Sequence, residues 1–222
     1  MRGRNLTDKI LKNLNEVQRQ AAQAIDGPVL VLAGAGSGKT RVLTSRIAYM
    51  VSQGIPPYHI LAITFTNKAA NEMKSRLMEM DCSAEMMTIC TIHSLCVRIL
   101  RQNAEKIGYE RNFSIYDEQD SAKIIKDICK LKDADDDKLK KFAAREISAA
   151  KTHGLTPEEY KSELGGEEII ADIFARYNET LFKSNAMDFD DLLLNTYKLL
   201  RGHPDVLDYY QERFRYISID EF

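Results

Sequence analysis

The chain has 222 residues, of which 44% are hydrophobic and 29% are charged, a composition typical of a globular protein with one or two domains. The 31 basic and 33 acidic residues leave a net charge of −2, so only a local site, and not bulk charge, can attract a nucleic acid. The longest apolar runs are too short to cross a membrane, and the N-terminus lacks a secretory pattern. Four cysteines without C-x-x-C spacing argue against disulfides and zinc, and predict a cytoplasmic location.

The first half of the chain alternates between short apolar runs and helical patterns. Residues 28–33 and 60–65 are predicted as buried strands, with a helix over 39–53 between them. A further helix leads to a third strand at 87–92, and another helix follows. Such alternation predicts an α/β fold with a parallel sheet.

The pattern changes at about residue 117, after which apolar residues recur only at helical spacing until about residue 184. Thr156 and Glu159 flank Pro157 as in a capping box, which predicts a helix start there. Helices are then expected at 189–200 and 206–210, and a strand at 216–219. We therefore predict an α/β domain over 1–104 and 186–222, interrupted by an all-helical insertion at 105–185.

The strongest motif is AGAGSGKT, which lies between a predicted strand and a predicted helix. Its glycines let backbone N–H groups surround phosphates, and the helix N-terminus favours an anion. Lys39 is placed to reach the β- and γ-phosphates, and the Thr40 hydroxyl to bind Mg²⁺. Ala33 stands where the pattern has its first glycine. The predicted ATP-binding loop consists of Gly34, Ala35, Gly36, Ser37, Gly38, Lys39 and Thr40.

A second motif, Asp220-Glu221, ends the last apolar strand. Together with a phosphate loop, this pair is typical of the Walker B element of P-loop NTPases. Asp220 is the candidate Mg²⁺ ligand and Glu221 the candidate base for the attacking water. The chemistry predicted is ATP hydrolysis, with Lys39, Asp220 and Glu221 as catalytic residues and ATP and Mg²⁺ as cofactors.

Six segments, in this order along the chain, resemble the superfamily 1 DNA helicases of the UvrD, Rep and PcrA kind. They are LNEVQ at 14–18, AGAGSGKTRVLT at 33–44, ILAITFTNKAANEM at 60–73, TIHSL at 91–95, MDFDDLL at 187–193 and ISIDEF at 217–222. The resemblance implies a RecA-like ATPase domain (1A) with a helical subdomain (1B) inserted. It also implies a 3′-to-5′ helicase that couples ATP hydrolysis to movement along single-stranded DNA.

The resemblance assigns further site residues. Gln18 matches a glutamine that reads adenine, and Arg41 an arginine that packs on the base, roles that an amide and a guanidinium suit. The implied DNA contacts are Phe65, Thr66, Asn67, Thr91, His93, Ser94 and Phe189. Aromatic stacking and neutral hydrogen bonds to phosphate need no large basic patch. Asp190 and Asp191 are interpreted as helix-starting residues instead.

The resemblance also implies partners and alternatives. Expected partners are single-stranded DNA, 3′-tailed duplex DNA and the C-terminal helicase domains of the same polypeptide, in repair or replication. Without those domains we expect weak ATPase activity, no unwinding, and some self-association through the edge of the last strand. A helicase-nuclease subunit, a P-loop small-molecule kinase and a non-hydrolysing binding module remain as alternatives.

Overall fold

The computed structural model describes residues 7, 9–34, 36–80, 82–132, 136–163 and 165–220. Ala35 and Glu221, both predicted site residues, lie outside this set. The chain divides into two compact units: Met1–Ser94 with Asp205–Phe222, and Leu95–Pro204. Among the described helices, none has the length and apolarity needed to span a membrane.

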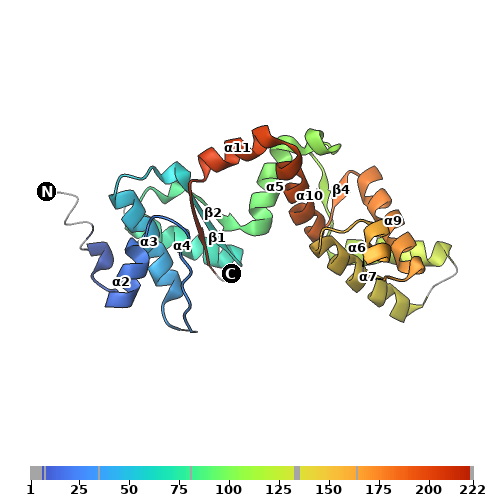
Figure 1. Ribbon diagram of the computed structural model, residues 1–222, viewed down its shortest axis with the longest axis horizontal. Coiled ribbons are helices and arrows are strands. Elements are labelled where there is room, and N and C mark those ends of the chain that lie inside the picture. Colours follow the sequence, from blue (N-terminus) through green and yellow to red (C-terminus); the bar gives the residue numbers. More distant parts are fainter. Residues whose placement is uncertain are drawn as a thin grey trace. The chain divides into compact units, whose positions relative to one another are not determined.

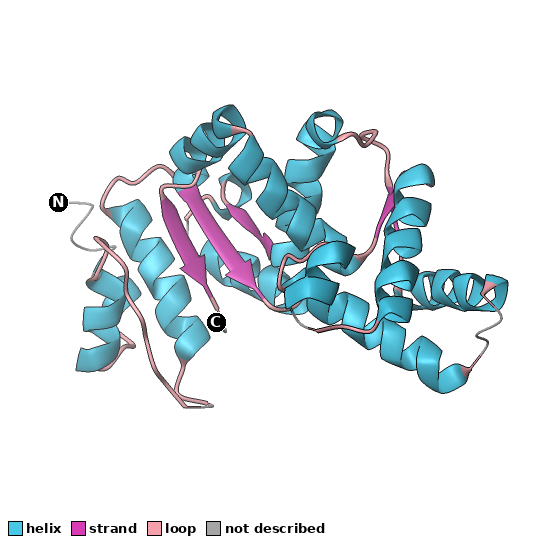
Figure 2. Ribbon diagram, turned by 45° about the vertical axis from the view of Figure 1, so that its right-hand side comes forward, coloured by secondary structure: helices cyan, strands magenta, loops and turns pink. Residues whose placement is uncertain are grey.

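The first unit contains a three-stranded parallel sheet with helices packed against it (Figures 1 and 2). Its elements are α2 (Glu16–Gln23), α3 (Lys39–Ser52), η1 (Pro57–His59), β1 (Ile60–Thr64), α4 (Asn67–Glu79), η2 (Ala84–Met86), β2 (Thr88–Thr91) and β5 (Tyr216–Ile219). Helix α5 (Ile92–Asn103) begins where this unit ends, and α11 (Pro204–Arg213) leads back into it.

The sheet has the order β2-β1-β5, with β1 in the centre. Thr64 of β1 is opposite Thr91 of β2, and Ile63 is opposite Ile219 of β5. Figure 1 shows the red C-terminal strand beside β1, although the two are far apart in sequence. Because all pairings are parallel, the three strands end at the same edge of the sheet.

Strand β1 is buried on both faces, as a central parallel strand should be. Ile60 and Ala62 join a core with Ile47 of α3 and Met73 of α4, while the alternating Leu61 on the other face is buried as well. The expected alternation of strands and helices is therefore confirmed from residue 39 to residue 91.

The prediction of a strand at 28–33 is wrong. These residues form an extended loop that pairs with none of the described strands, and its apolar side chains are exposed, Leu32 by 86%. A strand needs a hydrogen-bonded neighbour, and the adjacent sheet edge, β5, stays unpaired on its outer side within the described residues. Ile217 of β5 is also exposed, so self-association through this edge stays a prediction.

The second unit is mostly helical. It contains η3 (Ala104–Ile107), β3 (Ser114–Ile115), α6 (Glu118–Leu131), α7 (Asp137–Thr152), α8 (Pro157–Glu163), α9 (Glu168–Lys183), β4 (Ala186–Met187) and α10 (Phe189–Gly202). The predicted apolar stripes form its core, in which Ile128, Ile147 and Phe174 are buried together. The predicted capping box is confirmed, since Glu159 N donates to Thr156 Oγ1 at 3.2 Å and Thr156 N to Glu159 Oε2 at 2.7 Å.

One expectation about the insertion needs correction. It is not all-helical, because β3 and β4 form a small parallel sheet. The two compact units divide at other residues than 105 and 185, because most of α5 and all of α10 belong to the second unit. The insertion at 105–185 itself stays a prediction. Helix α10 packs against α7 and β4, and buried ion pairs to Lys151 hold its first turn there. Helical periodicity shows which face of α10 is buried, but not against which unit.

Candidate nucleotide and DNA site

Two predicted magnesium ligands, 180 residues apart in sequence, meet at the carboxyl edge of the sheet. Thr40 Oγ1, in the first turn of α3, donates to Asp220 Oδ2 at 3.2 Å. The backbone N–H of Asp220 donates to the carbonyl oxygen of Ile63 at 2.9 Å, which extends the β1–β5 ladder by one residue. The position of the carboxylate is thus set by strand pairing, beside the start of α3.

The loop before α3 needs glycine at two described positions. Gly36 and Gly38 have φ values of +73° and +89°, the left-handed region that other residues rarely adopt. At Gly38 a Cβ atom would also lie 3.3 Å from the Gln18 amide nitrogen. Lys39 Nζ bends back over this loop and donates to the carbonyl oxygens of Ala33 and Gly34, at 3.2 and 3.0 Å.

Gln18 connects helix α2 to the loop. Its Nε2 donates to the carbonyl oxygen of Ser37 at 3.0 Å, while its Oε1 accepts from the backbone N–H of Asn15 at 3.0 Å. The backbone N–H of Gln18 in turn donates to Asn15 Oδ1, which completes a capping box at the start of α2. The amide predicted to read adenine therefore also fixes the helix that carries it.

These residues surround one cavity of about 580 Å³, within the usual size of a small-molecule site. Its lining consists of Gln18, Gly36, Ser37, Gly38, Lys39, Thr40, Arg41, Ala69, Glu72, Arg76 and Asp220. The described ATP-site candidates thus gather here, with Gly34 at the loop's edge, bonded by Lys39. Glu72 and Arg76, an ion pair on α4, were not predicted.

The first DNA-contact candidates follow β1 at the same edge. Phe65 is 79% exposed, so it is not a core residue at a strand end. Thr66 is the N-cap of α4, with its Oγ1 accepting from Ala69 N at 3.1 Å, and Asn67 is the first helical residue. The Thr66 hydroxyl therefore has a local structural role in addition to the predicted one.

The second group follows β2, the neighbour of β1. Thr91 ends this strand opposite Thr64, so the two candidate segments leave the sheet side by side. Thr91 Oγ1 bonds the Ser94 hydroxyl at 2.9 Å and accepts from Ser94 N at 3.2 Å, which starts α5. His93 lies half-buried between them.

Phe189 lies in the second unit. It is the first residue of α10 and is 47% exposed. Asp188 is the N-cap of this helix and exchanges capping-box bonds with Asp191. The interpretation of Asp191 as a helix-starting residue is confirmed, but Asp191 is also part of a buried charge cluster.

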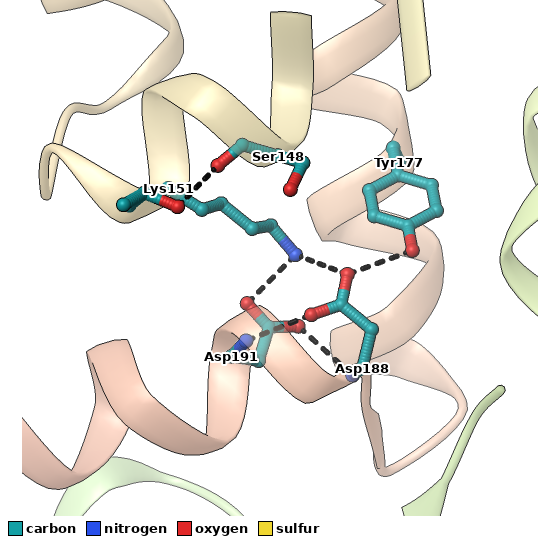
Figure 3. Close-up of polar contacts among 6 residues, drawn as sticks. Ser148, Lys151, Tyr177, Asp188 and Asp191 are labelled. Atoms are coloured by element: carbon teal, nitrogen blue, oxygen red, sulfur yellow. Dashed lines mark hydrogen bonds and ion pairs between the residues drawn. The ribbon is translucent and has the colours of Figure 1, made fainter. Parts of the chain in front are cut away.

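That cluster centres on Lys151 of α7 (Figure 3). Its ammonium lies 2.7 Å from Asp188 Oδ2 and 2.7 Å from Asp191 Oδ1, and its side chain is only 1% exposed. Tyr177 of α9 donates its hydroxyl to Asp188 Oδ2 at 2.8 Å. Three helices and the turn before Phe189 are thus joined by one group of charges.

One ammonium faces two carboxylates in this cluster, so one negative charge is left uncompensated. Burial, with the nearby charge of Asp188, raises the pKa of Asp191 against the opposing pull of Lys151. Burial and the charge of Asp188 likewise raise the pKa of Tyr177. Burial also raises the pKa of Tyr109 to about 12, with further contributions from Asp191 and Asp188.

Sequence reasoning missed Lys151. A signal was present, because Lys151 stands four residues after Ile147, on the apolar stripe of α7 that forms the core. A lysine at such a position must find buried counter-charges.

Comparison of the sequence with known proteins identifies the family of the chain. Residues 14–222 match the profile described as the UvrD/REP helicase N-terminal domain, and this match covers the loop, both candidate DNA-contact segments and Asp220. The chain belongs to the UvrD/REP helicase family.

The relatives of this UvrD/REP chain include three proteins named ATP-dependent DNA helicase PcrA. The protein of Bacillus subtilis is 46% identical over 98% of this chain, and those of Staphylococcus epidermidis and Staphylococcus aureus are 44% identical over 96%. The chain spans about 30% of the length of each.

We predict that Lys151→Met destabilises the second unit by about 3–5 kcal/mol, because it leaves two buried carboxylates without a cation. The matched control is Lys161→Met, which removes an exposed pair with Glu168 and should cost about 0–1 kcal/mol. Urea unfolding followed by circular dichroism measures both. Equal midpoints for the two variants would show that the cluster contributes no more than a surface pair.

A separate prediction concerns pH. Because folding raises the pKa of Asp191, the folded chain binds this proton more tightly than the unfolded chain, and the free energy of unfolding falls as pH rises through the raised value. Asp191→Asn removes this titration. The stability of the variant relative to the wild type should therefore increase between about pH 4 and pH 7.

Urea midpoints across this pH range provide the measurement. The control is Asp190→Asn, one residue earlier in the same helical turn, which leaves the cluster intact. A difference between Asp191→Asn and the wild type that stays constant with pH would contradict the assignment.

Proposed function

We propose that this chain is the ATP-binding part of a 3′-to-5′ DNA helicase, with a RecA-like domain 1A and an inserted subdomain 1B. The observation that carries the proposal is the hydrogen bond between Thr40 and Asp220 at the end of the phosphate loop. It joins a hydroxyl and a carboxylate beside a cavity of nucleotide size. The family membership supports the same function.

Within this proposal, each loop residue has a physical role. Backbone N–H groups from Gly34 to Thr40, at the N-terminus of α3, hold the phosphates. Lys39, whose ammonium already lies over the loop, turns from the carbonyl oxygens to the β- and γ-phosphates. Such fixed positive groups stabilise the charge of phosphoryl transfer.

The residues also fit a magnesium ion. Thr40 and Asp220 offer oxygen ligands 3.2 Å apart, the donor type that Mg²⁺ prefers. The bound ion would neutralise phosphate charge. Glu221, next to Asp220 in sequence, is proposed as the base that takes a proton from the attacking water.

Base recognition is assigned to Gln18 and Arg41, which line the same cavity. An amide can bond an adenine edge, and a guanidinium can pack on the ring. Since Gln18 also bonds Ser37 of the loop, base binding is directly linked to the position of the phosphate site.

The segments after β1 and β2 are proposed to bind single-stranded DNA. They leave neighbouring strands at the same edge of the sheet as Asp220, which follows β5. The exposed ring of Phe65 is the stacking surface. Asn67, His93 and the hydroxyl groups of Thr66, Thr91 and Ser94 are the polar contacts, and Phe189 contributes from the second unit. ATP and DNA would thus act on the ends of neighbouring strands.

Unwinding of 3′-tailed duplexes in repair or replication, in the cytoplasm, is proposed for the longer polypeptide. The chain covers about 30% of its relatives, and the remaining domains would complete both sites. Release of inorganic phosphate without a phosphorylated product separates this function from that of a kinase.

We predict that the chain binds a magnesium complex of a non-hydrolysable ATP analogue, and that Lys39→Ala abolishes binding because it removes the cation over the loop. Isothermal titration calorimetry, with and without oligothymidylate, is the measurement. Tighter binding in the presence of the oligonucleotide would show coupling between the ATP and DNA sites of the described residues.

Lys68→Ala is the matched control, since Lys68 is exposed on α4 and does not line the cavity. Wild-type affinity in Lys39→Ala would contradict the proposed site.

A further inference from the structure

Helix α10 has an exposed row of large side chains. Phe189, Leu193 and Tyr197 are 47%, 38% and 54% exposed, and Arg201 continues the row to the end of the helix. They follow one another at intervals of four residues, so they share one face of the helix. The adjacent face, with Leu192, Thr196 and Leu199, is buried. We name the row 189/193/197/201 the α10 stripe.

The chemistry of the α10 stripe changes along its length. At its C-terminal end, Arg201 Nη1 donates to the Tyr197 hydroxyl at 2.8 Å, which holds a cation beside the aromatic ring. Lys198, the residue after Tyr197, is exposed as well. At the N-terminal end, the carboxylate of Asp191 is turned inward to Lys151 and does not face the stripe. Aromatic rings flanked by cations are the combination that binds single-stranded nucleic acids.

The spacing favours a stretched single strand. Residues four apart on a helix are separated by about 6 Å along its axis, nearly twice the ~3.4 Å per nucleotide of a stacked strand. Only a strand whose bases are unstacked and free of a partner can place them at such intervals. Paired bases in a duplex offer no open face to the rings.

We propose that the α10 stripe is a single-stranded DNA track, in which Tyr197 stacks on a base and Arg201 binds the adjacent phosphate. The inference rests on the proposed function, because it extends the DNA contact assigned to Phe189 by about 18 Å along the same helix, as far as Arg201. Leu193 lies between Phe189 and Tyr197 in the row.

The buried charge cluster fixes the position of α10 within its unit, and with it the row of side chains proposed as the track. Asp188 and Asp191 hold the first turn of α10 to Lys151, and Tyr177 donates to Asp188 from α9. Figure 3 shows both carboxylates directed at the lysine from one helical turn. The row that begins with Phe189 therefore projects from a helix that cannot rotate without breaking buried ion pairs.

The test is binding of fluorescein-labelled oligothymidylate to the chain, measured by anisotropy over a range of salt concentrations. Tyr197→Ala should weaken binding about tenfold, and Tyr197→Phe should retain it. Arg201→Ala should reduce the slope of log K against log salt by about 0.7, the value for one phosphate contact on a single strand.

Leu131→Ala is the matched control, since Leu131 is an exposed apolar side chain of α6 in the same unit, and it should leave binding unchanged. Thermal melts of every variant show that the fold is retained. Photocrosslinking with 5-iodouracil oligonucleotides, followed by peptide mapping, should recover a peptide from α10.

Phe65→Ala separates a failure of the proposed DNA site in the first unit from a failure of the α10 stripe. If it weakens binding while Tyr197→Ala and Arg201→Ala do not, the proposed function stands and the α10 stripe is refuted. Crosslinks confined to the first unit would refute the stripe as well. If the wild-type chain binds no oligothymidylate, both the proposed DNA site and the stripe are overturned.

Discussion

The pairing of β5 with β1 is the contact on which the candidate ATP site depends. It joins residues 216–219 to residues 60–63 in parallel, so Asp220 emerges where β1 ends, and the first turn of α3 lies close enough for Thr40 to bond it. Because β2 pairs with the other side of β1, the candidate DNA segments emerge at the same edge. Ligands of parallel α/β sheets bind at the carboxyl ends of strands for this reason. A small shift of β1 would therefore move residues of both the candidate ATP site and the candidate DNA site.

The second unit is organised around a different interaction. A lysine and two aspartates are buried there, an arrangement that costs hydration and is retained only with close pairing. The cluster fixes α10 to α7 and α9, and so determines which side chains of α10 are exposed. A structural feature of the core thus decides the chemistry of the surface.

The sequence predicted most of these elements, and the exceptions have physical causes. The helices and strands of residues 39–91 were predicted correctly, because the spacing of apolar residues in each segment follows the face that is buried. The apolar run at 28–33 was misread, since apolarity predicts burial but says nothing about a pairing partner. Helix α2 had a signal in Asn15 and Gln18, which form its capping box. The place of Lys151 on the apolar stripe of α7 indicated a buried lysine, but its partners come from another helix and could not be predicted. The Glu72–Arg76 pair was beyond prediction because lining a cavity depends on tertiary packing.

The most direct test of the central claim is a double-mutant cycle with Thr40→Ala and Asp220→Asn. The measured quantity is the gain in affinity for the ATP analogue when Mg²⁺ is added. If the two side chains form one ion site, each single variant loses this gain and the double variant loses no more, so the effects are strongly non-additive. Additive losses would mean that Thr40 and Asp220 act independently, and would contradict the assignment.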